Sequence, residues 1–337
     1  MKTISRMGWL KIGTLEIGAL ILLAGVFALS PSLEAKDPAY PVKSITLLNP
    51  WVAGGAHELY ARALAPHLSK KFGVPVEVVC KPGGAGTVAT LEVMRSRPDG
   101  YTLLVDCPGS SSLQKALGSE LPYKIEERTY MARGIVLPSV IFVPASRPWK
   151  TLKDLEDAIR KDPADFKWAS CGGTGHSDLI MHLLKEGMIS HGVDLSQTKM
   201  VPYVSAVPAY TAIAGGHVDI YAGTRTGLKA FADAGKIRFL AATSKERTQV
   251  FPGLPTAVEQ GFPKLVTYFW VGFSGPPGLP KAVAEKWIET LKVMVNDPAN
   301  APIYDRLGGE AAFLAGDDFK KYVFEEADAV SKMALTK

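Results

Sequence analysis

Short apolar runs alternate with helix-like segments along most of this 337-residue chain. Runs at 44–48, 76–80 and 101–105 have the length and composition of strands, and amphipathic segments at 58–72 and 87–96 follow the first two. This alternation is typical of βαβ units, in which strands form a largely parallel sheet flanked by helices. Pro66 is unfavourable inside the first helical segment, because a mid-helix proline loses a backbone hydrogen bond.

A second series of the same kind begins after Pro144. It contains predicted strands at 167–170, 199–203, 218–222 and 237–242, with helices at 151–161, 178–188, 208–215 and 226–234. A strand at 269–274 then returns to the first part, and helices at 281–295 and 317–332 complete the chain. We therefore predict an α/β fold of two lobes, each with a mostly parallel sheet flanked by helices. Residues 36–143 and 252–337 form lobe 1, and residues 144–251 form lobe 2.

The first 35 residues are typical of an export signal. Lys2, Arg6 and Lys11 precede an apolar run at 17–29, and Ala35 offers a cleavage site. An uncleaved membrane anchor is the alternative, but the run is short for a spanning helix, which needs about 20 residues. We predict a cleaved signal peptide and a periplasmic protein.

Charge and cysteine content argue against several classes of partner. The formal net charge is only +5 and contains no basic stripe, so no nucleic-acid partner is expected. The three cysteines, Cys80, Cys107 and Cys171, form no CxxC pair, and we expect small buried residues, although a disulfide stays open. The six histidines show no metal-ligand spacing and most are expected at the surface or in loops. We predict no metal and no cofactor.

Known catalytic motifs are incomplete. The segment Gly175-His176-Ser177-Asp178-Leu179 begins like a nucleophile elbow, but leucine replaces the final glycine that its strained turn needs. The glycine-rich segments at 81–87 and 172–175 match neither the phosphate-loop nor the dinucleotide pattern. A secreted hydrolase using Ser177 is therefore disfavoured, and we expect a protein that is not an enzyme.

Polar, glycine-bearing loops recur between a strand and a helix N-terminus, at 50–58, 106–112 and 171–178. In open α/β sheets, ligands bind outside the carboxyl ends of the strands. Helix N-termini there offer unpaired N–H groups and partial positive charge, which suit a carboxylate. Such loops occur in many α/β proteins, so by themselves they leave ligand binding open.

At these same loops the sequence resembles the substrate-binding proteins of tripartite tricarboxylate transporters, the Bug family. The matching segments cover the predicted mature chain in order. They are Asn49-Pro50-Trp51-Val52-Ala53-Gly54-Gly55 with Ala61-Arg62, Lys81-Pro82-Gly83-Gly84-Ala85-Gly86, Pro98-Asp99-Gly100-Tyr101, Val201-Pro202-Tyr203, Gly215-Gly216-His217-Val218-Asp219, Ala234-Gly235-Lys236-Ile237-Arg238, Ala242-Thr243-Ser244-Lys245-Glu246-Arg247 and Pro255-Thr256 with Glu259 and Gly261.

This resemblance implies a periplasmic-binding-protein, or Venus-flytrap, fold that closes on a small carboxylate and delivers it to membrane transporter subunits. It implies no catalysis, and we expect a monomer. The ligand contacts that it implies are Trp51, Val52, Ala53, Gly54, Gly55, Glu58, Cys107, Ser110, Ser170, Gly172, Thr174, Ser177, Thr224 and Arg225.

Departures from the family pattern bear on the ligand. Trp51 replaces the usual phenylalanine and Glu58 the usual aspartate, while Gly223 stands where aspartate is common. Arg225 could pair with a second carboxylate or be solvated. With Phe269 and Trp270, Trp51 is expected near the cleft, which favours a dicarboxylic or aromatic ligand. A ligand sensor that signals to a membrane kinase is the alternative function.

Overall fold

The structure is a computed structural model that describes residues 40–117, 120–171 and 175–334. The chain divides into an N-terminal unit, Met1–Tyr40, and a main unit, Pro41–Lys337, to which the following description applies. The signal peptide predicted at 1–35 lies outside the described residues. Within the described ranges, no helix is both long enough and apolar enough to cross a membrane.

Lobe 1 is built on a mixed sheet with the strand order β10-β4-β9-β3-β1-β2. Strands β1, β2 and β3 are parallel, whereas β9 is antiparallel to β3, and β4 is antiparallel to both β9 and β10. Helix α2 contacts α9 and α10, and α11 packs against α4. The lobe 1 elements are β1 (Ile45–Asn49), α2 (Ala56–Phe72), β2 (Val76–Cys80), α3 (Thr87–Arg95), β3 (Thr102–Asp106), α4 (Ser112–Leu117), α9 (Lys281–Asn296), α10 (Ala301–Leu307), β10 (Glu310–Ala315) and α11 (Gly316–Ala334).

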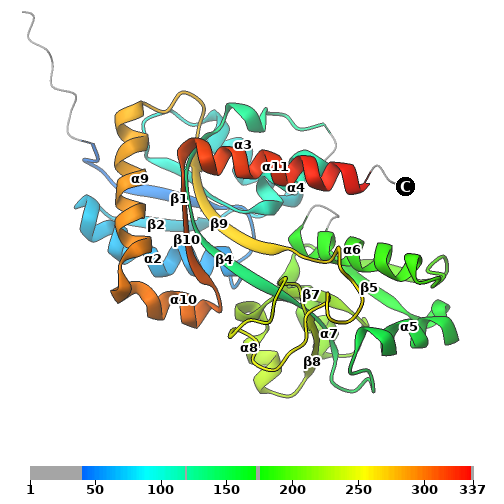
Figure 1. Cartoon of the computed structure of the whole chain (residues 1–337). Helices are drawn as coiled ribbons and strands as arrows, with labels where there is room; N and C mark the ends of the chain where they lie inside the picture. The colour runs from blue at the N-terminus through cyan, green and yellow to red at the C-terminus, as the bar shows by residue number, and fades with distance from the viewer. Residues whose placement is uncertain (1–39, 118–119, 172–174, 335–337) are drawn as a thin grey trace, which may run out of the picture. The chain divides into compact units, whose positions relative to one another are not determined.

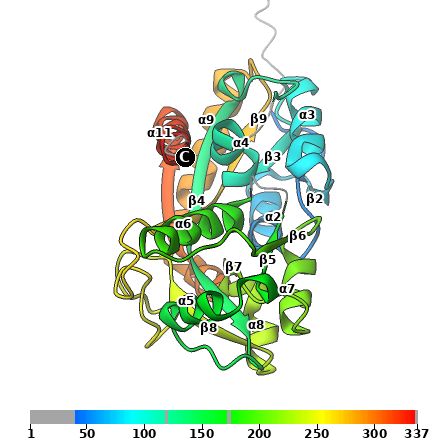
Figure 2. The ribbon, with the colours of Figure 1, turned by 90° about the vertical axis from the view of Figure 1, so that its right-hand side faces the viewer.

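Lobe 2 contains the second βαβ series. Strands β5 and β6 are parallel, while β7 and β8 are antiparallel to the last part of β4. Figure 2 shows α5 to α8 below α3, α4, α9 and α11 of lobe 1. The lobe 2 elements are α5 (Leu152–Lys161), β5 (Lys167–Ser170), α6 (His176–Ser190), β6 (Lys199–Pro202), α7 (Ala206–Ala214), β7 (Tyr221–Thr224), α8 (Arg225–Asp233) and β8 (Ile237–Ala242).

Two neighbouring strands, β4 (Thr129–Pro144) and β9 (Tyr268–Gly275), connect the lobes (Figure 1). They pair with each other through Leu137 opposite Phe269 and Pro138 opposite Tyr268. Thr243 holds the crossing point, because its hydroxyl donates to the carbonyl oxygens of both Ser139 and Thr267, at 3.2 and 2.8 Å. The lobe boundaries predicted at residues 143 and 251 stay predictions, since the crossing strands belong to both lobes.

The predicted two-lobed α/β fold is confirmed, but the sheets are mixed rather than mostly parallel, because β4 and β9 run antiparallel to their neighbours. Several local differences also occur. Helix α2 runs through Pro66 without a break. Strand β7 ends at Thr224 and α8 begins at the next residue, so the loop expected after Ala222 is absent. Helix α10 and strand β10 were not predicted, because their short sequences gain stability from packing on the lobe 1 sheet rather than from local pattern.

A buried ion pair holds the loop after β3. The Asp106 carboxylate is fully buried and accepts hydrogen bonds from the Ser110, Ser111 and Ser274 hydroxyls at 2.7 to 2.8 Å. Arg128 donates to the same carboxylate at 2.9 Å and to the Ser110 carbonyl at 3.0 Å. These bonds leave few polar groups of the loop unpaired, so the loop has one well-defined position.

We expect the substitution Arg128→Leu to lower the free energy of unfolding by about 3–5 kcal/mol, because it leaves the Asp106 carboxylate buried without its counter-charge. Urea denaturation followed by circular dichroism measures this change. Arg97→Leu, at an exposed arginine of lobe 1, is the control and should leave stability nearly unchanged. Equal effects of the two substitutions would show that the buried pair does not stabilise the loop.

Candidate functional site

A cavity of about 90 Å³ is lined by residues of both lobes and of the two crossing strands. Lobe 1 contributes Trp51, Val52, Gly55, Ala56, His57, Cys107 and Gly109. Lobe 2 contributes Cys171, Gly175, His176, Ser177, Ser205, Ala206, Val207, Tyr210, Tyr221, Gly223, Thr224 and Gly227. Ser139 of β4 and Phe269 of β9 complete the lining. We call it the ligand cavity.

Four helices begin at this cavity. The residues that precede α2, α6, α7 and α8 are Gly55, Gly175, Ser205 and Thr224, and all four line it. The first N–H groups of a helix have no partner within the helix, and the helix dipole adds partial positive charge there. One helix belongs to lobe 1 and three belong to lobe 2, so an anion in the cavity would face N-termini from both lobes.

The described lining contains no Asp, Glu, Lys or Arg. Aromatic and aliphatic side chains dominate it, including Trp51, Val207, Tyr210 and Phe269. Among the described residues, no group of three or more histidine, cysteine or acidic side chains could hold a metal ion. The cavity is therefore electrically neutral in its side chains, and helix N-termini and dipolar groups provide its polarity.

Two buried histidines, His57 and His176, each contact the ring of Phe269. The His57 ring centroid lies 6.0 Å from that of Phe269, and the His176 centroid lies 5.4 Å from it on an edge-on ring contact. No nitrogen of either imidazole has a hydrogen-bond partner within the described parts of the chain. Burial lowers the pKa of both His57 and His176 to about 3, so both rings are neutral near pH 7.

Three hydroxyls of the lining share this property. The Oγ atoms of Ser139 and Ser205 and the Oη atom of Tyr221 are buried and lack a partner among the residues described. A buried polar atom without a partner is unfavourable by about 1–3 kcal/mol. Five such side chains around one cavity are typical of a site for a polar guest, because natural proteins leave few buried polar groups unsatisfied.

Tyr210 explains two glycines of the lining. A Cβ atom at Gly223 would lie 2.3 Å from the Tyr210 hydroxyl oxygen, and one at Gly227 would lie 2.7 Å from its ring. Any side chain at Gly223 would clash with the hydroxyl and ring of Tyr210. Gly223, which stands where aspartate is common in the family, is therefore required by packing.

The three cysteines are free thiols, which settles the open disulfide question for this structure. Burial raises the pKa of Cys107 to about 11 and that of Cys171 to about 12, so both are protonated near pH 7. The Trp51 indole N–H donates to the Cys107 sulfur at 3.4 Å. Cys107 therefore positions Trp51 and lacks the thiolate character of a nucleophile.

The structure brings six of the predicted contact residues together. Trp51, Val52, Gly55, Cys107, Ser177 and Thr224 all line the ligand cavity. Gly172 and Thr174 lie outside the described residues. Ala53, Gly54, Glu58, Ser110, Ser170 and Arg225 are not part of the described lining. As ligand contacts, all of these residues stay predictions.

Several residues that were expected at or near the site lie elsewhere in the structure. Glu58 forms an ion pair with Arg62 and accepts a hydrogen bond from the Gly54 N–H at 3.3 Å, so it stabilises the first loop. The Ser110 hydroxyl is occupied by Asp106. Arg225 lines a different cavity on the other side of the crossing strands. Trp270, expected near the cleft, packs on Phe319 in lobe 1, with its centroid 5.2 Å away.

Sequence reasoning missed His57, His176, Ser139, Ser205 and Tyr210. The two histidines are buried, unlike most histidines expected from the sequence. A local signal existed for His57, His176 and Ser205, since His57 and His176 lie within two residues of the glycine that precedes a helix and Ser205 itself precedes one. Ser139 and Tyr210 offered none, because only strand crossing and helix packing bring them to the cavity.

Comparison with known proteins agrees with this architecture. A UPF0065 protein of Bordetella bronchiseptica is 30% identical over 322 residues, covering 94% of this chain and 92% of the relative. The periplasmic binding protein BugD has 26% identity and a TM-score of 0.77, covering 87% of this chain and 97% of BugD. An R. palustris protein solved with adipate shares the fold with a TM-score of 0.83 at 24% identity, covering 88% and 98% of the two chains.

The family model described as the tripartite tricarboxylate transporter family receptor matches residues 60–334, which is most of the chain. The match of this family model agrees with the two-lobed fold and the cavity at the lobe junction. The chain belongs to the tripartite tricarboxylate transporter receptor family, the solute-binding proteins of the TctC and Bug type.

Proposed function

We propose that this protein is a periplasmic solute-binding protein that captures a small carboxylate in the ligand cavity and delivers it to a tripartite membrane transporter. The observation that carries the proposal is the convergence of four helix N-termini on a cavity without charged side chains in its described lining. Main-chain N–H groups and helix dipoles stabilise an anion there. Membership of the receptor family supports delivery to a transporter.

The imidazoles of His57 and His176 support binding of the ligand without catalysis. Neither ring accepts a hydrogen bond from a hydroxyl of the described residues. The general base of a serine hydrolase makes such a bond to its serine. Their pKa values of about 3 also make both rings weak bases. Cys107 and Cys171 are protonated thiols. The groups around the cavity therefore suit hydrogen bonding to a guest that leaves unchanged.

The lining favours a carboxylate with an aromatic or apolar body. Trp51, Phe269 and Tyr210 can contact a ring or chain, and the N-termini can hold the carboxylate. A second carboxylate would find no arginine in the described lining, since Arg225 lies in another cavity. We therefore rank aromatic monocarboxylates ahead of dicarboxylates.

Closure of the lobes completes the proposed mechanism. The cavity of about 90 Å³ is smaller than the roughly 300–1,000 Å³ of typical small-molecule sites. A guest must therefore enter while the lobes are further apart. Contacts from His57 in lobe 1 and His176 in lobe 2 then stabilise the closed form, which the membrane partner recognises.

A pair of ligands with the same shape and different charge tests the proposal. We expect benzoate to bind at least about tenfold more tightly than benzamide, because the amide has the same shape without the negative charge that helix N-termini stabilise. Isothermal titration calorimetry with purified protein measures both, and adipate and phenylacetate extend the series. Equal affinities for benzoate and benzamide would contradict anion capture, and the absence of binding to every acid would remove this ligand class.

The histidines provide a second test. His57→Leu keeps an apolar side chain but removes the ring nitrogens, so we expect the affinity for the bound carboxylate to fall about tenfold, the equivalent of about 1.4 kcal/mol. His67→Leu, on the exposed side of the same helix, is the matched control and should bind like the wild type. An unchanged affinity of His57→Leu would remove this histidine from the site.

The pH dependence of binding distinguishes neutral from charged imidazoles. Because the folded-state pKa of each ring is about 3, both are neutral from pH 6 to 8, and protonation would occur only below that range. The affinity for a carboxylate should therefore stay constant across pH 6–8, with a calorimetric enthalpy independent of the buffer. A loss of affinity as the pH rises from 6 to 8 would instead indicate capture by an imidazolium.

A further inference from the structure

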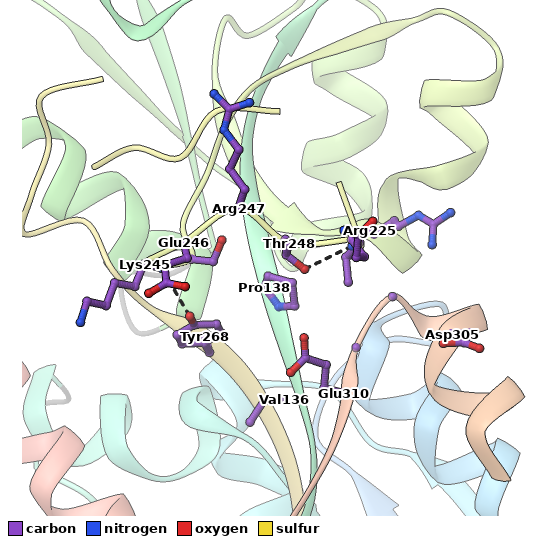
Figure 3. A pocket seen from close by; sticks show the side chains of 15 residues that line it. Val136, Pro138, Arg225, Lys245, Glu246, Arg247, Thr248, Tyr268, Asp305 and Glu310 are labelled. Atoms are coloured by element: carbon purple, nitrogen blue, oxygen red, sulfur yellow. Dashed lines mark hydrogen bonds between the residues drawn. The ribbon is translucent and has the colours of Figure 1, made fainter. Parts of the chain in front are cut away.

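A second, larger cavity lies on the other side of the crossing strands. Its volume is about 610 Å³, and Figure 3 shows Pro138 and Tyr268 on the strands between its walls. We call it the rear groove. Its walls are formed by Arg225 and residues 244–250 of lobe 2, and by Asp305 and residues 308–310 of lobe 1.

The two cavities share the crossing strands as a common wall. Successive side chains of a strand point to opposite faces of the sheet. On β4, Ser139 lines the ligand cavity and its neighbour Pro138 lines the rear groove. On β9, Phe269 lines the ligand cavity and its neighbour Tyr268 lines the rear groove.

This geometry couples the widths of the two cavities. Both are bounded by the same two lobes, so a rotation about the crossing strands that opens one must narrow the other. In this structure the ligand cavity has about 90 Å³ and the rear groove about 610 Å³. The lobes are therefore drawn together on the ligand side and apart on the rear side.

The two walls of the rear groove carry opposite charges. Lobe 1 contributes Asp305 and Glu310, and the Glu310 side chain extends toward the crossing strand that carries Pro138 (Figure 3). Lobe 2 contributes Arg225 and Lys245. None of these four side chains forms an ion pair with another described residue.

Two further charges on the lobe 2 wall change this balance little. Arg247 is neutralised by Glu259, which it contacts at 2.9 and 3.1 Å. Glu246 reduces the positive charge of this wall without reversing it. The lobe 2 wall is therefore net positive and the lobe 1 wall net negative.

One end of the groove is already closed by a contact between the lobes. The Thr226 hydroxyl donates to the carbonyl oxygen of Leu307. The Arg225 side chain packs so closely on Gly308 that a Cβ atom there would lie 3.0 Å from two of its carbons. This contact between α8 and α10 can serve as a fulcrum, about which the remaining walls approach each other.

We propose that the rear groove is an electrostatic latch for the open form of the protein. When the ligand cavity opens, Glu310 and Asp305 approach Lys245 and Arg225, and the attraction between them stabilises the open state. The charged walls thereby set how much of the ligand-free protein is open and reduce ligand affinity by the same factor. The proposal rests on the lobe closure of the proposed function, but it concerns the ligand-free equilibrium.

Charge reversal on the exposed acidic wall tests the latch. Glu310→Lys cancels the net negative charge of the lobe 1 wall and places a lysine opposite the net positive lobe 2 wall, so the groove should stay wide and the ligand cavity closed. Small-angle X-ray scattering of the ligand-free protein should show a smaller radius of gyration than the wild type at low salt. The difference should shrink at high ionic strength, because salt screens exposed charges. An unchanged radius of gyration would overturn the latch.

Two variants control for net charge and for direct pairing. Glu289→Lys makes the same charge change at an exposed position of α9 outside the groove and should scatter like the wild type. The double variant Glu310→Lys/Lys245→Glu restores opposite charges at positions 310 and 245 and should recover the wild-type radius. A compact Glu289→Lys, or a double variant as compact as Glu310→Lys, would contradict the proposal.

Ligand binding adds a readout that separates the two proposals. If benzoate binds the wild type, Glu310→Lys should bind it about threefold more tightly, the range of effect expected for exposed charges. Unchanged benzoate affinity together with an unchanged radius overturns the latch. Absence of carboxylate binding in every variant counts against the proposed function, while the scattering result still decides the latch.

Discussion

The pairing of β4 with β9 is the constraint on which the rest of the structure depends. These two strands are the connection along the chain between the lobes, and Thr243 ties them together through the carbonyl oxygens of Ser139 and Thr267. Strand β4 spans 16 residues and hydrogen-bonds to strands of both lobes. The helices that follow β1, β5, β6 and β7 begin at one junction between the lobes.

The electrostatics of the ligand cavity follow from this arrangement. Arginine is a common partner of carboxylates in proteins, but it does not occur in the described lining of this cavity. Helix N-termini replace it, and they cannot be displaced like a flexible side chain because the backbone holds them. The neutral imidazoles of His57 and His176 add hydrogen-bonding groups without adding charge. In the proposed function, such a site combines selectivity for an anion with an apolar environment for its body.

Side chains alternate between the two faces of the crossing strands, so these strands form a wall of both the ligand cavity and the rear groove. A movement of the strands therefore affects both cavities. Neighbouring residues such as Tyr268 and Phe269 belong to different cavities, although both lie at the start of the same strand. A change of charge in the rear groove can thus influence ligand binding without touching the ligand. In this protein the hinge is therefore part of the control of affinity as well as a connection.

The sequence could predict features formed by residues that are adjacent in the chain, but it could not predict contacts between residues that are distant in the chain. The strand, glycine loop and helix sequence around 45–72 was predicted correctly, because apolar runs, Gly54, Gly55 and the start of α2 are adjacent in the chain. The family motifs extended that reading to the two-lobed fold. The burial of His57 and His176 was missed, because a histidine next to a glycine loop looks the same whether a second lobe covers it or not.

The sequence by itself determined the βαβ order, the glycine-bearing loops at helix N-termini and the family, since these are properties of residues close together in the chain. Only the tertiary structure decided which side chains meet. It assigned Arg225 to the rear groove rather than the ligand cavity, because β7 ends at Thr224 and α8 starts at once. It also placed Trp270 in the lobe 1 core while its neighbour Phe269 faces the cavity. The physical reason is that strand pairing and lobe packing select the face of each side chain, and neither is visible in a local pattern.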